Sequence, residues 1–259
     1  MGVRSNGHIA MSVKRWRSAL EVIQAVAIIA VCAAILWVLL FRGAQPVPSA
    51  QAAATGRGSA APPPPPPLPA EPLSLDGAAR LGSAEAAIAL IVYSDFQCPY
   101  CGRFARETLP TLVAEYIKPG KVLLAFRHFP LANHVFAQKA AESAECAGQQ
   151  GKFWEMHDGL FFNQRDLNLD ALAERAHALG LDARRFNSCL EGLAVGRVQS
   201  DFKAGQGLTV TGTPTFFAGL RLPDGRVKVS KRFAGAAPVN QFRTTLDGLL
   251  ATLPSNAVR

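Results

Sequence analysis

The chain has 259 residues, of which 49% are hydrophobic, and a formal net charge of +8. Residues 1–42 hold five Lys or Arg and one Glu, so 5 − 1 = +4 of this charge lies there. The remainder is only mildly basic, which argues against nucleic-acid binding. Residues 73–259 form one stretch that is long enough for a single well-buried core.

An apolar run over residues 22–41, interrupted only by Gln24, has the length that crosses a bilayer. Lys14, Arg15 and Arg17 precede it. Positive charge on this side predicts a single-pass anchor in the inner (cytoplasmic) membrane with a cytoplasmic N-terminus and a periplasmic or otherwise extracytoplasmic C-terminal part.

We therefore expect a cytoplasmic basic tail over residues 1–19 and a transmembrane anchor over residues 20–42. A cleaved signal peptide is the alternative, because small residues over 48–54 would suit a peptidase. The Ala/Pro-rich residues 43–72 include six consecutive prolines and are expected to form an extended linker.

The exported part, residues 73–259, alternates strand and helix patterns. Apolar runs predict strands over 87–96 and 122–129, with a helix between them, which makes a parallel crossover unit. Residues 131–205 read as a helical insertion. Further strand patterns lie around a Pro-Asp-Gly turn, and an amphipathic helix closes the chain. The fold class is therefore α/β.

The chemistry of the chain is concentrated in Cys98-Pro99-Tyr100-Cys101, where the first of these strands ends and a helix begins. Pro99 suits the first helical turn. The helix N-terminus would stabilise a Cys98 thiolate and lower its pKa from about 8.5 to roughly 3.5–7. We expect Cys98 to be the exposed nucleophile and Cys101 the less exposed, resolving cysteine.

Two other uses of this cysteine pair are conceivable from its spacing, a zinc site and a static disulfide. A zinc site normally needs four ligands, and the chain has no second such pair and only scattered histidines, so no metal is expected. A static disulfide would not explain the position at a strand-to-helix turn. A redox pair is the better interpretation.

The exported domain resembles the thioredoxin-fold, DsbA-like thiol:disulfide oxidoreductases, especially their membrane-anchored or exported branch. The resemblance covers about residues 75–250. It is carried by the segments YSDFQCPYCGRF, FRHFPLANH, AAESAECAGQQGKFWEMHDGLF, LGLDARRFNSCL and GTPTFFAG. The resemblance implies a thioredoxin fold with the helical insertion. It also implies an activity that requires no metal or organic cofactor.

The resemblance also implies that Pro214 follows a cis peptide bond and faces the cysteine pair, which leaves the Thr213 backbone to bind an extended substrate. Without it, an ordinary trans proline would be the better reading. Some exported members of the family have a second disulfide in the helical block, which implies a structural Cys146–Cys189 bond. Two free buried cysteines are the alternative.

Three positions bear on how far the resemblance extends. The family commonly buries an acid where this chain has Val92. Asp95 could take over proton transfer, or it could be a solvent-facing cap. Tyr100 stands where DsbA has histidine and gives a glutaredoxin-like dipeptide, so we expect Cys98 to be acidic, but less so than in DsbA. His128 and His134 flank the segment after the second strand. His128 or Arg103 could tune the active site, but turn packing or solvation is the expected role of each. His157 is expected to pack helices together.

The sequence thus predicts an exported, membrane-anchored oxidoreductase that forms disulfides in exported proteins through Cys98 and Cys101. Its partners would be cysteine-containing exported proteins and a membrane redox partner, such as a quinone-linked oxidase. One alternative is a reductase or isomerase fed by a transmembrane electron donor. Another is a tethered chaperone or binding domain without redox turnover.

Overall fold

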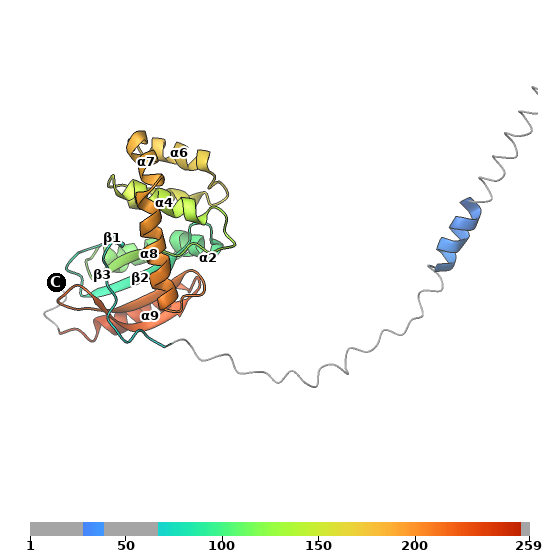
Figure 1. Ribbon diagram of the computed structural model, residues 1–259. Helices are drawn as coiled ribbons and strands as arrows, with labels where there is room; N and C mark the ends of the chain where they lie inside the picture. The colour runs from blue at the N-terminus through green and yellow to red at the C-terminus, as the bar shows by residue number, and fades with distance from the viewer. Residues whose placement is uncertain (1–27, 39–66, 255–259) are drawn as a thin grey trace, which may run out of the picture. The chain divides into compact units, whose positions relative to one another are not determined.

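The computed structural model describes residues 28–38 and 67–254, and the chain divides into two compact units, Met1–Pro63 and Pro64–Arg259. In the first unit, residues 28–38 form a helix with exposed side chains (Figure 1). Across the described ranges, no helix combines the length and apolar character that a membrane crossing needs. The basic tail and most of the predicted anchor and linker lie outside the described residues.

The second unit is built on a five-stranded sheet in the order β1-β3-β2-β4-β5. The neighbours β2 and β3 are parallel, as the crossover pattern predicted, and every other pair is antiparallel. The strands are β1 Ala79–Leu81, β2 Ile88–Ser94, β3 Val122–His128, β4 Thr215–Arg221 and β5 Val227–Ala234. The three-residue edge strand β1 was not predicted from the sequence, because it is too short to show a period.

A long helical stretch joins β2 to β3. It consists of α2 (Pro99–Arg103), the π-helical turns η2 (Phe104–Thr108) and η3 (Val113–Ile117), and α3 (Leu109–Leu112) between those turns. Helix α3 begins one residue before Pro110. Proline has no N–H to donate to the preceding turn, which explains an interruption at this point.

The helical insertion contains five helices. Asn168 and Asp182 cap two of them, because the Asn168 side chain accepts a hydrogen bond from the Ala171 N–H and Asp182 accepts one from the Arg185 N–H. The helices are α4 Ala137–Gly148, α5 Phe153–Phe162, α6 Leu169–Ala178, α7 Ala183–Leu190 and α8 Leu193–Gly207. The closing helix α9, Val239–Leu250, follows β5.

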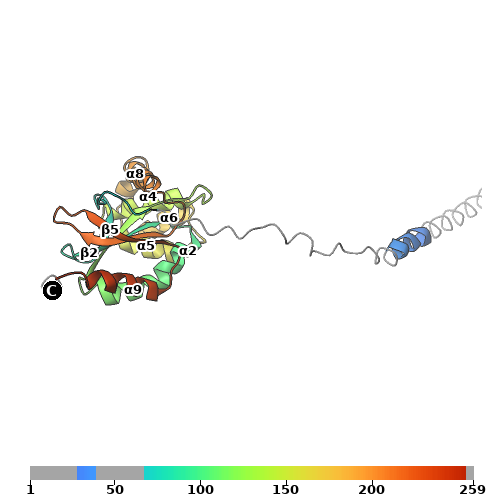
Figure 2. The same ribbon diagram turned by 90° about the horizontal axis from the view of Figure 1, so that it is seen from below.

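Strand β2 is buried on both faces, and the two faces belong to different apolar clusters. Leu90 packs in the cluster that includes Phe242 of α9, while Ile91 packs in the cluster to which Phe202 of α8 adds its side chain. Figure 2 shows α9 on one side of the sheet and α8 on the other. The end of β2 is therefore held in the middle of the domain.

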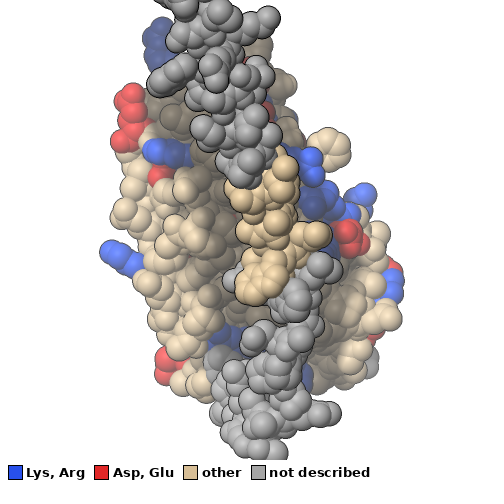
Figure 3. Space-filling model, turned by 90° about the vertical axis from the view of Figure 1, so that its right-hand side faces the viewer, with Lys and Arg blue, Asp and Glu red and all other residues tan. Residues whose placement is uncertain are grey.

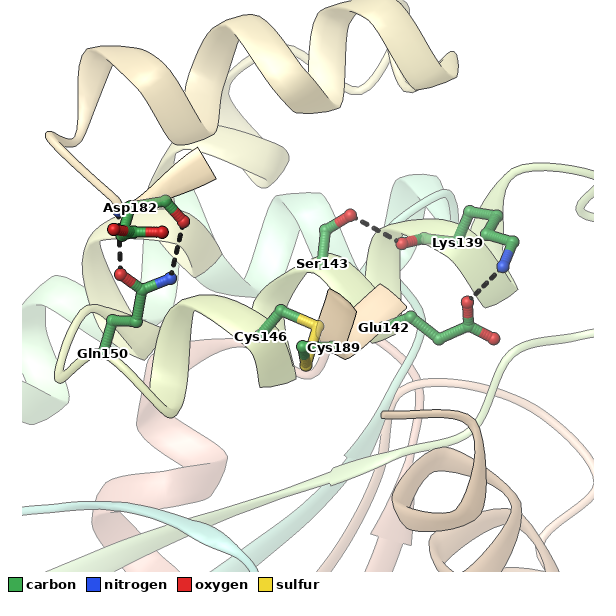
Figure 4. The surroundings of a disulfide bond; sticks show 7 residues. All are labelled: Lys139, Glu142, Ser143, Cys146, Gln150, Asp182 and Cys189. Carbon is green, nitrogen blue, oxygen red and sulfur yellow. Dashed lines mark hydrogen bonds and ion pairs between the residues drawn. A yellow bond between two sulfur atoms is a disulfide. The ribbon is translucent and has the colours of Figure 1, made fainter. Parts of the chain in front are cut away.

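A disulfide joins Cys146 of α4 to Cys189 of α7, with a Cα–Cα distance of 5.6 Å (Figure 4). It is the pair that the family resemblance implied. A second link lies beside it, because Gln150 exchanges two hydrogen bonds with the backbone of Asp182. The disulfide and these hydrogen bonds together hold α4 and α7 against each other within the insertion.

A buried ion pair attaches α8 to the sheet. Asp201 of α8 lies 2.7 Å from Arg127 of β3 and also accepts the His128 N–H. Arg197, one helical turn before Asp201, forms a further ion pair with it. A buried charge is tolerated only when it is paired and hydrogen-bonded, and this cluster meets both conditions.

Candidate active site

The cysteine pair follows directly after β2. Cys98 is the N-cap of α2 with an extended backbone, and Pro99 occupies the first helical turn, as predicted. Cys98 and Cys101 are free thiols in this structure. The Gly102 N–H donates to the Cys98 carbonyl oxygen, so the four-residue motif is already helical in its hydrogen bonding.

The peptide bond between Thr213 and Pro214 is cis. The Cys98 Sγ lies 3.3 Å from the Thr213 carbonyl oxygen, so the loop before β4 contacts the cysteine pair at the same end of the sheet. This contact also corrects one expectation. Cys98 is 3% exposed rather than open to solvent, because the Thr213 loop approaches its sulfur.

The two sulfurs differ in acidity. Hydrogen bonding from the Cys101 thiol is the largest cause that lowers the pKa of Cys98 to about 5, and the backbone N–H groups of Tyr100 and Cys101 act in the same direction against burial. Burial, followed by the bond to Cys98, raises the pKa of Cys101 well above its usual value. The pair thus holds one thiolate on Cys98 and one proton on Cys101.

The acidity of Cys98 agrees in direction with the sequence expectation. A pKa of about 5 lies below the roughly 8.5 of a free cysteine and above the roughly 3.5 of DsbA. Tyr100 cannot supply the charge of an imidazolium here. The residue is 54% exposed, and the Arg103 guanidinium lies 5.7 Å from the centroid of its ring.

Asp95 is fully buried, so the expectation of a solvent-facing cap was wrong. Its Oδ1 accepts the N–H groups of Gln97 and Cys98, at 2.7 and 3.2 Å. Its Oδ2 accepts the Leu131 N–H and contacts His134 Nδ1, both at 2.8 Å. The carboxylate therefore does cap the active-site turn, but from inside the protein.

The helical insertion reaches the same turn through Gln164, a residue that the sequence reasoning missed. Its Nε2 donates to the carbonyl oxygens of Phe96 and Cys98, at 2.7 and 2.9 Å. Gly102 makes this approach possible, because a Cβ at that position would meet the Gln164 Oε1 at 2.0 Å. The glycine directly after the cysteine pair was the one sequence signal of this contact.

The position where the family commonly buries an acid is apolar here. Val92 is 1% exposed and belongs to the same apolar cluster as Cys101. The backbone N–H of Asp95 approaches the Cys101 Sγ at 3.5 Å. Burial among apolar side chains, followed by the hydrogen bond to Cys98, raises the pKa of Cys101, whereas the Ser94 side chain and the Asp95 backbone N–H act in the opposite direction.

The other histidines belong to the interior. His128 bonds Glu145 at 2.8 Å and packs against Phe126, and burial lowers the pKa of His157. Packing was the expected role of both residues. Among the described residues no cluster of His, Cys, Asp and Glu has the arrangement of a metal site. Figure 3 shows described Lys and Arg side chains at several separate places on the visible surface, with Asp and Glu side chains among them.

A redox-capable cysteine pair at the start of a helix, opposite a cis-proline loop, on a sheet of this order defines a thiol-disulfide oxidoreductase of thioredoxin fold. A sequence model described as Thioredoxin matches residues 75–231. The chain belongs to this family, and its domain has the DsbA-like form of the fold with a helical insertion.

Solved structures agree with this assignment. The alpha-DsbA1 of Wolbachia pipientis is 27% identical with a TM-score of 0.60, over 69% of this chain and 94% of that one. A thioredoxin-like oxidoreductase from Silicibacter pomeroyi is 26% identical with a TM-score of 0.56, over 68% and 94%. BdbD of Bacillus subtilis has a TM-score of 0.60 at 21% identity, over 70% and 96%, a likeness of fold alone.

The curated relatives of this chain are named as antiporters and not as oxidoreductases. The Na(+)/H(+) antiporter NhaA 1 of Salinispora arenicola is 35% identical over 193 residues, which are 74% of this chain and 28% of that protein. The NhaA 3 of Salinispora tropica is 42% identical over 142 residues, which are 54% and 21%. The match with this chain spans less than a third of the length of these relatives.

Proposed function

We propose that the chain is an exported, membrane-tethered thiol-disulfide oxidoreductase that forms disulfides in exported proteins through Cys98 and Cys101. The difference in acidity between the two sulfurs carries this proposal. A stabilised Cys98 thiolate favours the reduced form of the enzyme, which makes its disulfide a ready acceptor of electrons. The cysteine pair itself transfers the electrons.

The reaction consists of two exchanges. A client thiolate attacks the Cys98 sulfur of the oxidised enzyme, the Cys98–Cys101 bond breaks, and Cys101 leaves and takes up a proton. A second client thiolate then attacks the client sulfur of the mixed disulfide and releases Cys98 as a thiolate. The client loses two electrons and the enzyme gains them. The low pKa of Cys98 makes it the better leaving group.

The Thr213–Pro214 loop would bind the client during this exchange. The Thr213 backbone lies beside the Cys98 sulfur, at the start of β4. An extended client segment could pair there with the main chain, which would place its cysteine next to Cys98 without a demand on its sequence. Such binding fits an enzyme that accepts many clients.

Export and tethering rest on the sequence and on the relatives. The apolar run over residues 22–41 follows a basic segment, which favours an inner-membrane anchor with the domain on the periplasmic side. The Cys146–Cys189 disulfide suits an oxidising compartment. Relatives named antiporters hold a matching segment in a longer chain, which supports a place at a membrane. A quinone-linked membrane oxidase would then accept the two electrons.

A reductase or isomerase is the second candidate, and Tyr100 favours it. The Pro-Tyr dipeptide resembles that of glutaredoxins, whose potentials of about −200 to −230 mV are less oxidising than the −120 mV of DsbA. The redox state of the pair in cells separates the two directions. An oxidase is found mainly with the Cys98–Cys101 disulfide, and a reductase mainly with two thiols.

Trapping of clients tests the enzyme itself. In a Cys32→Ala background, which removes the free cysteine of the N-terminal helix, Cys101→Ala should accumulate mixed disulfides on Cys98 that a reductant releases. The matched control is Cys98→Ala in the same background. If Cys101→Ala traps no more protein than Cys98→Ala, the tethered chaperone or binding domain becomes the better account.

A further inference from the structure

One buried carboxylate connects the active-site turn to the loop after β3. Asp95 Oδ1 accepts the Cys98 N–H at 3.2 Å, and Oδ2 of the same carboxylate contacts His134 Nδ1 at 2.8 Å. The Asp95 side chain has no exposed surface, whereas that of His134 is 17% exposed. A chain of two hydrogen bonds thus leads from the backbone of the nucleophile to a partly solvent-accessible imidazole.

The loop that carries His134 is itself attached to this turn. The Leu131 N–H donates to Asp95 Oδ2, and the Phe136 N–H donates to the Gln97 side-chain oxygen, both at 2.8 Å. The His134 N–H also donates to the Leu131 carbonyl oxygen, which makes the loop a closed turn. These hydrogen bonds hold the backbone of the loop, and with it the residue that carries the imidazole, close to the Asp95 carboxylate.

The charged groups of the neighbouring elements have other partners. On β3 and α8, Arg127 pairs with Asp201, and His128 bonds Glu145 of α4. On α2, Arg103 lies over the Tyr100 ring. Within the described part of the chain, His134 is thus the ionisable side chain that the structure bonds to the Asp95 carboxylate.

A carboxylate beside a thiolate opposes it, since like charges repel strongly at the low effective dielectric of a protein interior. A proton donated from His134 Nδ1 to Oδ2 withdraws negative charge from the Oδ1 side, which is the side that meets Cys98. It also fixes the carboxylate in the orientation that accepts the Gln97 and Cys98 N–H groups.

We propose that His134, acting through Asp95, is a positioning residue that stabilises the Cys98 thiolate. This inference rests on the proposed role of Cys98 as the redox nucleophile. His134 touches neither client nor sulfur in this account. Its contribution is to compensate the buried negative charge of Asp95, whose carboxylate accepts the Cys98 N–H. Val92 stands where the family commonly buries an acid, and Tyr100 stands where DsbA has histidine.

The test is a titration of the thiolate absorbance of the reduced protein, with four variants beside the unmodified chain. His134→Leu removes the donor, whereas His134→Asn keeps an N–H near the position of Nδ1. Asp95→Asn removes the negative charge, and the fourth variant combines Asp95→Asn with His134→Leu. Circular dichroism and melting temperature report separately on folding.

We expect His134→Leu to lower the fraction of Cys98 thiolate near pH 5 by about threefold. The reason is that the negative charge of the Asp95 carboxylate is then no longer partly compensated and opposes the thiolate more strongly. His134→Asn should restore most of it. Asp95→Asn should raise the thiolate fraction, because it removes the opposing charge. In the Asp95→Asn background, His134→Leu should then have no further effect on the titration.

Three results would overturn the inference. One is an unchanged titration in His134→Leu with a lowered melting temperature, which describes a purely structural residue. The second is an unchanged titration in Asp95→Asn, which decides the question even if His134→Leu does not fold. The third is an equal shift by His134→Leu in both backgrounds. If the unmodified chain itself shows no thiolate below pH 7, the proposed role of Cys98 fails instead.

Discussion

The Cys98 Sγ lies 3.3 Å from the carbonyl oxygen of Thr213, a residue 115 positions further along the chain. This contact joins the two segments that the chemistry needs, one at the end of β2 and one at the start of β4. Antiparallel pairing of β2 with β4, in which Tyr93 lies opposite Thr215, places them at the same end of the sheet. The site is therefore a consequence of strand order.

The first prediction concerns the reactivity of Cys98. Alkylation of the reduced protein should follow a titration with a midpoint near pH 5, because the thiolate is the reactive form. The rate of carboxymethylation from pH 3 to pH 9 measures it. Cys98→Ala, which leaves the buried Cys101, should remove this phase. A midpoint near 8.5 would mean that the surroundings do not stabilise the thiolate.

The second prediction concerns stability against pH. The pKa of Cys98 is lowered in the folded, reduced protein, so between about pH 5 and pH 8.5 the unfolded chain binds more protons. The unfolding free energy of the reduced form should therefore rise with pH in this window, and the gain should be lost as pH falls through about 5.

Denaturant titrations of the oxidised form provide the control for this effect. Its Cys98 cannot titrate, so its stability should lack this part of the pH dependence. Equal slopes for the two redox forms between pH 5 and pH 8 would contradict the assignment of the thiolate to the folded state.

The third prediction concerns the disulfide of the insertion. Cys146 and Cys189 are 43 residues apart in sequence, and closing a loop of that length stabilises a fold by roughly 4 kcal/mol in the chain-entropy model. The double variant Cys146→Ala/Cys189→Ala should lose free energy of unfolding of this order. Its thiolate titration at Cys98 should stay in place, because the bond is part of the α4–α7 packing and not of the active-site turn. A loss of the titration in a folded variant would refute this separation.

The fourth prediction concerns the ion pair between β3 and α8. Replacement of Asp201 by leucine leaves the buried Arg127 guanidinium without a counter-charge, although it keeps its hydrogen bonds to the carbonyl oxygens of Ser74 and Asp76. This loss should cost about 3–5 kcal/mol of unfolding free energy. The matched control is Asp224→Asn in the exposed pair with Arg226, which should cost at most about 1 kcal/mol. Chemical denaturation of both variants gives the comparison. Equal losses would show that burial does not decide the effect.

Much of the domain was open to prediction from the sequence, because its elements have clear periods. The apolar run of β2 and the helix that begins at Pro99 predicted a crossover unit, and the structure has it. The cis bond before Pro214 did not follow from local pattern. It needed the family resemblance, since any proline before a strand reads the same way.

The contacts around the cysteine pair were out of reach for a different reason. Gln164 and His134 reach the active-site turn from the insertion and from the loop after β3, at sequence distances that no periodic pattern encodes. Asp95 was recognised as a candidate, yet its burial depends on those same long-range partners. The contacts of Gln164, His134 and Asp95 with the active-site turn can therefore be identified only from the folded structure.

The reduction potential of the Cys98–Cys101 pair tests the central claim most directly. Equilibration of the domain with glutathione buffers at pH 7, read out by thiol alkylation and mass, gives its value. With a stabilised Cys98 thiolate, we expect a potential between about −120 and −200 mV. A value between about −200 and −270 mV, the range of glutaredoxins and thioredoxin, would contradict an enzyme that donates disulfides and would favour a reductase.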